Sequence, residues 1–118
     1  MPQFTYTILS RAVPGREEEF VAWYRDQHIA DVCRMPGVIG GQLFRMDFQR
    51  VYDLDAAPQW TLMAIYELEG EHPEPIIDSI RAASGSAQMP ACAALDKSGM
   101  MQAAGHLIAA GGAMIKDQ

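Results

Sequence analysis

The chain has 118 residues, of which 49% are hydrophobic and 20% charged, and its formal net charge is -6. This length suits a single domain with a buried core, and the composition is that of a folded globular chain rather than a disordered one. The negative net charge and the lack of a Lys or Arg cluster argue against nucleic acid as a partner. The lack of a long apolar stretch argues against a membrane. The N-terminus has no signal-peptide pattern, which predicts a cytoplasmic protein.

A strand and a helix are predicted at the start of the chain. Residues 3–12 are predicted to form the strand, because Phe4, Tyr6 and Ile8 alternate with the residues between them. Residues 17–34 are predicted to form an amphipathic helix that begins with three glutamates and ends before the helix-breaking pair Pro36-Gly37. At about 100° per residue, its apolar stripe consists of Phe20, Val21, Tyr24, Val32 and Met35.

Two polar residues, His28 and Asp31, fall within this apolar stripe. An imidazole or a carboxylate is costly to bury unless it is hydrogen-bonded or faces a wet pocket. The stripe therefore predicts either buried partners for both groups or a cavity along this side of the helix.

The rest of the chain supplies two more strands, a helix and a closing strand. Residues 38–48 are predicted to form a strand with a bulge at Gly40-Gly41, residues 49–59 a loop, and residues 60–68 the strand that completes an antiparallel hairpin. A second helix is predicted within residues 71–85, where prolines stand near the first turn. Residues 86–101 are expected to be irregular, with a short helical turn near residues 91–95, and residues 102–110 to form the last strand.

This order of elements predicts one domain, residues 1–118, with a ferredoxin-like βαββαβ fold. In that α+β fold two helices cover one face of a four-stranded antiparallel sheet. The first three predicted strands carry apolar or aromatic side chains on both faces, which is too much apolar surface for the second face to meet water. We therefore expect a symmetric homodimer formed through that face.

The segment WYRDQHIADVCRMPGVIGGQLFRM, residues 23–46, resembles the EthD-like branch of the dimeric α+β barrel superfamily. The features that carry the resemblance are Trp23, His28, the Pro36-Gly37 turn and the strand that follows. The resemblance implies paired ferredoxin-like subunits, each with a small cavity between its sheet and helices. Members of the superfamily include cofactor-independent monooxygenases, polyketide cyclases, dehydratases, isomerases and haem-degrading enzymes. In several of them a histidine of the first helix acts as acid or base, and His28 is the matching position.

Four residues are candidates for acid/base chemistry. His28 is the first, because an imidazole titrates near neutral pH. Tyr24, four residues earlier on the same face, is placed to hydrogen-bond the imidazole or a substrate oxygen, and Asp31 is placed to fix the tautomer of the imidazole. His106 is a second acid/base candidate, since its small neighbours leave space around it. The alternative is purely structural: a histidine capped by the backbone or a strand side chain, beside a core tyrosine.

A second group of residues is predicted to shape the pocket. Trp23 and Gln27 flank the apolar stripe of the helix. Tyr6, Phe44 and Tyr66 reach the cavity if their strand faces point toward the helices, but alternation alone does not tell which face does. Packing in the core, or for Trp23 against the domain edge or a dimer partner, is the alternative role for these aromatic residues.

No cofactor or metal is expected from the sequence. The histidines lack an HxH or HxxxH spacing, Cys33 and Cys92 are not spaced as a metal or redox motif, and no glycine-rich phosphate loop follows a strand. Haem handling would require a histidine ligand in the pocket, for which His106 is the late candidate.

The leading hypothesis is a small enzyme that acts on an apolar aromatic or polyketide-like molecule, with His28 as the acid/base of a dehydration, cyclisation or isomerisation. A cofactor-independent oxygenase is the alternative within enzymes, because a deprotonated substrate can react with oxygen itself. The alternative from another class is a non-catalytic dimer that holds a small hydrophobic ligand, with His28 as a hydrogen-bonding contact.

Overall fold

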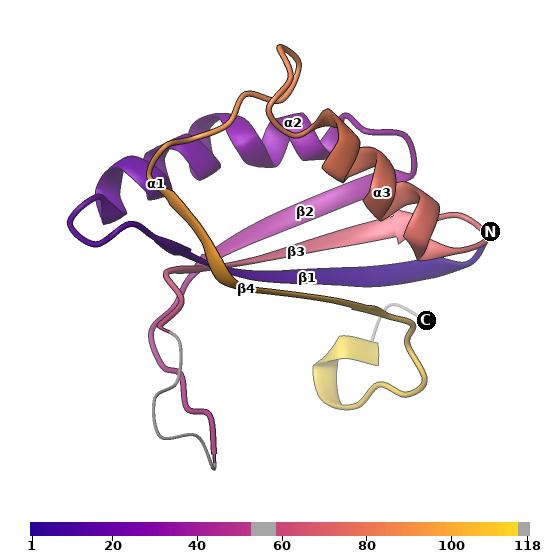
Figure 1. Ribbon diagram of the computed structural model, residues 1–118. Coiled ribbons are helices and arrows are strands. Elements are labelled where there is room, and N and C mark those ends of the chain that lie inside the picture. Colours follow the sequence, from indigo (N-terminus) through magenta and orange to yellow (C-terminus); the bar gives the residue numbers. More distant parts are fainter. Residues whose placement is uncertain (53–58, 116–118) are drawn as a thin grey trace.

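The four strands of the protein form one antiparallel sheet, and the helices lie on one of its faces (Figure 1). These features come from a computed structural model that describes residues 1–52 and 59–115. The elements in order are β1 (Gln3–Ala12), α1 (Glu17–Trp23), the π-helical turn η1 (Tyr24–His28), α2 (Ile29–Cys33), β2 (Val38–Arg45), β3 (Leu62–Glu69), α3 (Pro73–Ala83), β4 (Leu95–Gly105) and the 3-10 turn η2 (Gly112–Ile115). The strand order β2-β3-β1-β4 confirms the predicted ferredoxin-like fold.

The central strand β1 has the predicted bounds and two distinct faces. Tyr6, Ile8, Ser10 and Ala12 are buried beneath the helices. The residues between them point to the opposite face of the sheet, because successive side chains of a strand alternate. Alternation therefore predicted the two faces of β1, and the structure shows which of them meets the helices.

The first helix is confirmed in extent, but its middle turn is not α-helical. α1, η1 and α2 form one continuous rod over the sheet (Figure 1). The Ile29 N–H donates to the Tyr24 carbonyl five residues earlier, one residue more than an α-helix spans. π-turns of this kind are rare and occur most often at functional sites. The regular 100° projection therefore describes each end of the rod but not its middle.

The hairpin of β2 and β3 is confirmed, and so is the bulge at its start. The register against β3 shifts between Val38 and Gly40, which lets Gly41 turn toward the helices. β2 ends at Arg45, so the predicted strand over residues 38–48 is too long by its last three residues. Residues 49–52 and 59 of the predicted loop lie outside the strands, whereas residues 53–58 fall outside the described part of the chain.

The last strand differs from its prediction. α3 lies within the predicted range, but β4 begins at Leu95, where a short helical turn was expected, and ends at Gly105 instead of residue 110. Pairing with β1 explains both limits, because it runs from the partner of Ala12 to the partner of Thr5. Ile108 lies past this pairing and is 88% exposed. No helix within the described residues is long and apolar enough to cross a membrane.

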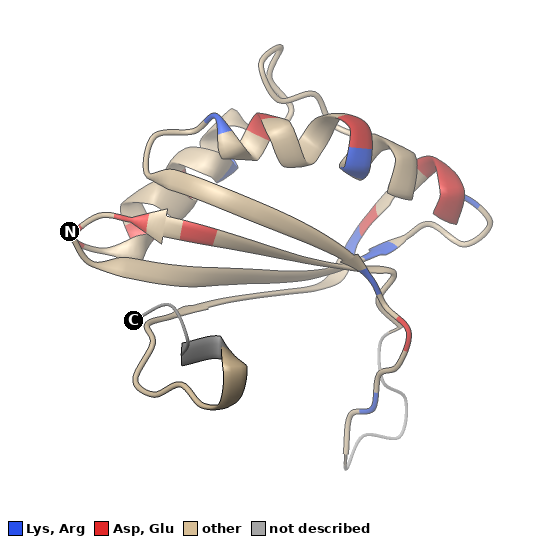
Figure 2. Cartoon of the chain, turned by 180° about the vertical axis from the view of Figure 1, so that it is seen from behind, with Lys and Arg blue, Asp and Glu red and all other residues tan. Residues whose placement is uncertain are grey.

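The face of the sheet opposite the helices carries a row of apolar side chains. Register places Phe44 beside Met63, Met63 beside Leu9, and Leu9 beside Met101, so the row crosses all four strands. Phe44 is 40% exposed and Met101 is 52% exposed. Charged residues gather on the helices, loops and strand ends (Figure 2), and two segments, residues 46–52 and the one containing η2, extend on this open side of the sheet (Figure 1).

Gly41 allows a close approach that tests this packing. A Cβ at position 41 would lie 2.8 Å from Tyr66 Cδ1 and 2.9 Å from Cys33 Sγ, and Tyr66 is fully buried and cannot move aside. We predict that Gly41→Ala lowers the free energy of unfolding by about 1 to 3 kcal/mol through overpacking. Urea denaturation measures the change.

Gly40→Ala is the matched control, because a Cβ at position 40 meets no heavy atom within 4 Å. Its free energy of unfolding is expected to stay within about 1 kcal/mol of the wild type. Equal losses in the two variants would contradict the assigned register.

Candidate functional site

Tyr24, on the first turn of η1, is the point at which the helix contacts the sheet. The Tyr66 hydroxyl on β3 donates to the Tyr24 hydroxyl at 3.2 Å, and both side chains are buried. Burial raises the pKa of Tyr24 to about 12 and raises the pKa of Tyr66 as well, so both phenols stay protonated at neutral pH. Because Tyr24 accepts from Tyr66, its own O–H remains available as a donor.

His28 lies one turn further along the helix within an aromatic cluster. Its ring stacks on Trp23 with 4.3 Å between ring centroids and meets the edge of Tyr24 at 4.7 Å. His28 Nδ1 and Trp23 Nε1 are buried without a hydrogen-bond partner among the described residues. Nε2 is not buried in this way, so it is the more accessible of the two ring nitrogens.

The charge state of His28 follows from this environment. Burial lowers the pKa of His28 to about 4, and the nearby Asp31 carboxylate only partly opposes that shift. At neutral pH the imidazole is therefore uncharged, which is the form that accepts a proton.

A cavity of about 180 Å³ lies against this cluster, between the helix, α3, the segment after α3 and the sheet. Its walls are mostly apolar and include Ile8, Val32, Ile80, Met89, Leu95 and Met100. An apolar cavity of about 150 Å³ holds benzene, so this space suits a molecule the size of one ring. The Tyr6 hydroxyl, which donates to Gln102 Oε1 at 2.8 Å, adds a polar group to the lining.

The cavity brings together four of the predicted site residues. Tyr6, Trp23, Tyr24 and His28 all line it. Tyr66 lies beneath Tyr24 and contacts it without lining the cavity. The predicted residue of the sheet and the predicted residues of the first helix therefore line the same cavity.

Asp31 does not occupy the predicted position next to the histidine ring. It is buried, but its carboxylate pairs with the Arg34 guanidinium, and no hydrogen bond joins it to His28 among the described residues. Arg34 follows Asp31 by three residues, so the two side chains lie on the same face of the helix and form an ion pair in place of the expected Asp31–His28 hydrogen bond. Asp31 therefore acts on His28 through space.

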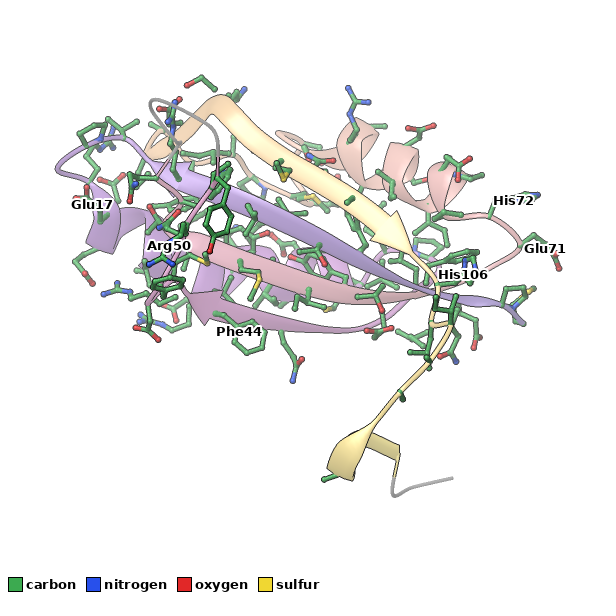
Figure 3. The ribbon with its side chains drawn as sticks, turned by 90° about the horizontal axis from the view of Figure 1, so that it is seen from below. Glu17, Phe44, Arg50, Glu71, His72 and His106 are labelled. Atoms are coloured by element: carbon green, nitrogen blue, oxygen red, sulfur yellow. The ribbon has the colours of Figure 1, made fainter. Side chains whose placement is uncertain are left out.

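Three other candidates lie away from the cavity. Gln27 is exposed on the helix, and Phe44 points to the open face of the sheet because the bulge reverses the alternation of β2. His106 follows the last residue of β4 and lies at the far end of that strand (Figure 3), in a shallow groove with Thr5 and Thr7. His28 is therefore the histidine of this cavity within the described ranges.

Several lining residues were not predicted, and they come from α3, from the segment after it and from β4. They are Arg81, Met89, Cys92, Lys97 and Gln102. Arg81 gave no signal comparable to that of His28, because at about 100° per residue it falls beside the apolar stripe of α3 and not within it. Among the described residues, no three His, Cys, Asp or Glu side chains converge as metal ligands would.

Solved structures with a similar fold include the following three. A protein of Shewanella loihica PV-4, described provisionally as a monooxygenase, shares 17% identity over 93% of this chain and 99% of its own, with a TM-score of 0.55. An ethyl tert-butyl ether D (EthD) family protein of Bacillus halodurans C-125 shares 12% identity over 92% of this chain and 100% of its own, with a TM-score of 0.55. A dimeric ferredoxin-like protein of unknown function from Thermobifida fusca YX shares 12% identity over 90% of this chain and 92% of its own, with a TM-score of 0.51.

These likenesses confirm the expected resemblance to the EthD-like, ferredoxin-like proteins at the level of the fold. No family model matches the sequence, and a comparison with curated proteins finds no match. The chemistry of the cavity must therefore be argued from its own residues.

The lowered pKa of His28 predicts how stability depends on pH. In the unfolded chain His28 is protonated below its ordinary pKa of about 6.5, whereas in the folded chain it is protonated only below about pH 4. Protonation therefore favours the unfolded chain between these values, and the free energy of unfolding decreases as the pH falls through this range. We predict that His28→Gln removes about 3 kcal/mol of this loss. Urea denaturation at about pH 7 and about pH 4 measures it.

His72→Gln is the control, because His72 is exposed at the start of α3. It should leave the pH dependence of unfolding close to that of the wild type. A wild-type slope that persists in His28→Gln would show that the imidazole is not held neutral by burial.

Proposed function

We propose that the protein is a small-molecule enzyme in which His28 acts as the acid/base group on an apolar, aromatic or polyketide-like substrate of about one ring. The observation that carries this proposal is the neutral imidazole beside the cavity, with one ring nitrogen sealed by protein and the other more accessible. A histidine whose role is structural normally has its nitrogens hydrogen-bonded, and neither nitrogen of His28 has a partner among the described residues.

The reaction supported best is proton transfer within one substrate molecule. His28 Nε2 accepts a proton from a carbon next to a carbonyl, and the electron pair of the broken C–H bond moves to the carbonyl oxygen. The free O–H of Tyr24 donates to that developing oxyanion. The same proton is then returned to another carbon, which is isomerisation, or to a departing hydroxyl group, which leaves as water.

Two neighbours stabilise the imidazolium that forms during this reaction. The face of Trp23 stacks on the ring and interacts favourably with a cation through its π electrons. The Asp31 carboxylate raises the pKa of His28 through space, even though its hydrogen bond goes to Arg34. An anionic intermediate in the cavity would raise that pKa further, which brings the base closer to the substrate in proton affinity.

A cofactor-independent oxygenase is the second candidate function. The protein from Shewanella loihica that shares the fold is described provisionally as a monooxygenase. The first step is the same, because a substrate deprotonated by His28 can react directly with molecular oxygen. A non-catalytic dimer that binds a hydrophobic ligand is the third candidate, and it requires no proton transfer.

The test uses a panel of single-ring compounds with an acidic C–H next to a carbonyl, followed by NMR in deuterated water. We predict that the wild type exchanges or eliminates at that carbon and that His28→Gln lowers kcat about a hundredfold or more while binding is kept. The acid limb of kcat/KM is expected near pH 4, because the base must be neutral in the free enzyme.

Three outcomes separate the candidates, with His72→Gln as the control that keeps full turnover. Turnover that needs air and consumes oxygen identifies the oxygenase. Binding without turnover of any compound identifies the ligand-binding dimer. Turnover that is equal in His28→Gln and the wild type refutes the role of the histidine.

We also propose that the protein is a homodimer formed through the open face of the sheet. The row of Phe44, Met63, Leu9 and Met101 crosses this face, and a second copy would cover it. The related structure from Thermobifida fusca is described as dimeric.

Sedimentation equilibrium tests the dimer. Phe44→Glu places a charge at one end of the apolar row that forms the proposed interface, and we predict that it raises the dimer dissociation constant at least about a hundredfold. Ala30→Glu adds the same charge to the exposed side of α2 and should leave the dimer intact. A monomeric wild type, or an equal effect of both changes, contradicts the proposal.

A further inference from the structure

The basic residues in the described part of the chain fall into three groups according to their partners. Five arginines form ion pairs with carboxylates, namely Arg11, Arg16, Arg25, Arg34 and Arg45. Arg50 stacks over the rings of Phe48 and Tyr52. Arg81 and Lys97 have no ion pair among the described residues, and both line the cavity.

The residues that line the cavity therefore carry positive charge, whereas the chain as a whole has a negative net charge. The sequence has 15 acidic and 9 basic residues, yet none of the described residues that line the cavity is Asp or Glu. Arg81 is in the last turn of α3, where a cation suits the helix dipole. That explanation does not extend to Lys97, which comes from the start of β4 and reaches the same cavity.

We propose that the natural ligand is a small anion: a single apolar ring that carries a carboxylate or an equivalent anionic group. The ring occupies the space among Val32, Ile80 and Met89, and the anionic group is held by Arg81 and Lys97. This proposal specifies the substrate class of the enzyme proposed above, and it rests on that proposed function. A binding measurement tests it without any measurement of turnover.

Three physical arguments support an anion over a neutral ring. An unpaired carboxylate is costly to bury, and two cations without carboxylate partners offset that cost. Arg81 also favours negative charge inside the site, since its guanidinium opposes the rise in the pKa of Tyr6. A neutral ring would gain the same apolar contacts but would leave both cations unused.

Calorimetric titration of the full chain with three single-ring probes tests the proposal. The probes are benzoate, benzamide and benzyl alcohol, which share a ring and differ in charge. We predict that benzoate binds at least about tenfold more tightly than either neutral probe, and that its affinity falls as salt is added while theirs does not.

Charge-removing variants locate the anion. Arg81→Gln and Lys97→Gln should each weaken benzoate binding about tenfold and leave benzamide binding unchanged, which shows that the cavity is intact. Arg45→Gln removes the same charge from an arginine paired with Glu18 outside the cavity and should change neither. Arg81→Lys should restore part of the affinity for benzoate.

The proposal is overturned if benzamide binds as tightly as benzoate, if no probe binds at millimolar concentration, or if Arg81→Gln and Lys97→Gln behave like Arg45→Gln. Its failure is distinguishable from that of the acid/base proposal, because His28→Gln should keep the preference for benzoate whatever it does to turnover. Turnover of neutral rings only, with no preference for anions, would refute the substrate class and leave the role of His28 standing.

Discussion

The contact between the hydroxyls of Tyr24 and Tyr66 is the interaction on which the site depends. A buried phenol must place its hydroxyl against a partner, and each of these two uses the other. The contact holds the first helix over β3, and the rings of Phe20, Trp23 and His28 pack around Tyr24. Gly41 leaves space for the Tyr66 ring on the neighbouring strand, because a Cβ at position 41 would lie 2.8 Å from Tyr66 Cδ1. Through Tyr66, this glycine of β2 also fixes the position of Tyr24 in the cavity wall.

This arrangement gives the two ends of the site different electrostatic characters. The aromatic wall withholds water and hydrogen-bond partners from His28 and so keeps the ring uncharged. Arg81 and Lys97 line the same cavity from α3 and β4 and place two basic side chains there. One polar group from each of the two helices, His28 and Arg81, thus lines the same small cavity.

The sequence predicted the elements with strong periodicity and missed those defined by their neighbours. β1 was correct to the residue, since Tyr6 and Ile8 alternate clearly. β4 was displaced because its segment LDKSGMM lacks β-branched and aromatic residues, and its strand geometry comes from pairing with β1. The apolar run after His106 resembles a strand, but β1 offers no partner there.

The candidate site could be predicted in part for the same reason. Helical periodicity placed Tyr24 and His28 on one side of a helix, and the structure adds that this side meets a cavity. The contribution of Met89, Lys97 and Gln102 depends on how the segment after α3 folds back over the sheet, and no local pattern encodes that path. Asp31 shows the limit of spacing arguments, because the competing partner Arg34 has the same spacing in the helix.

The π-turn changes the direction in which the side chains of α2 point relative to those of α1. Because η1 contains one residue more than a regular turn would, the side chains of α1 and α2 are offset by about 100° from a single regular helix. If residues 24–28 took up regular α-helical geometry with every residue kept, α2 would turn by about 100° relative to α1. The orientation of α2 over the sheet therefore depends on the π-turn, which ties the geometry around His28 to the packing of the buried residues at both ends of the helix, Phe20 and Val32.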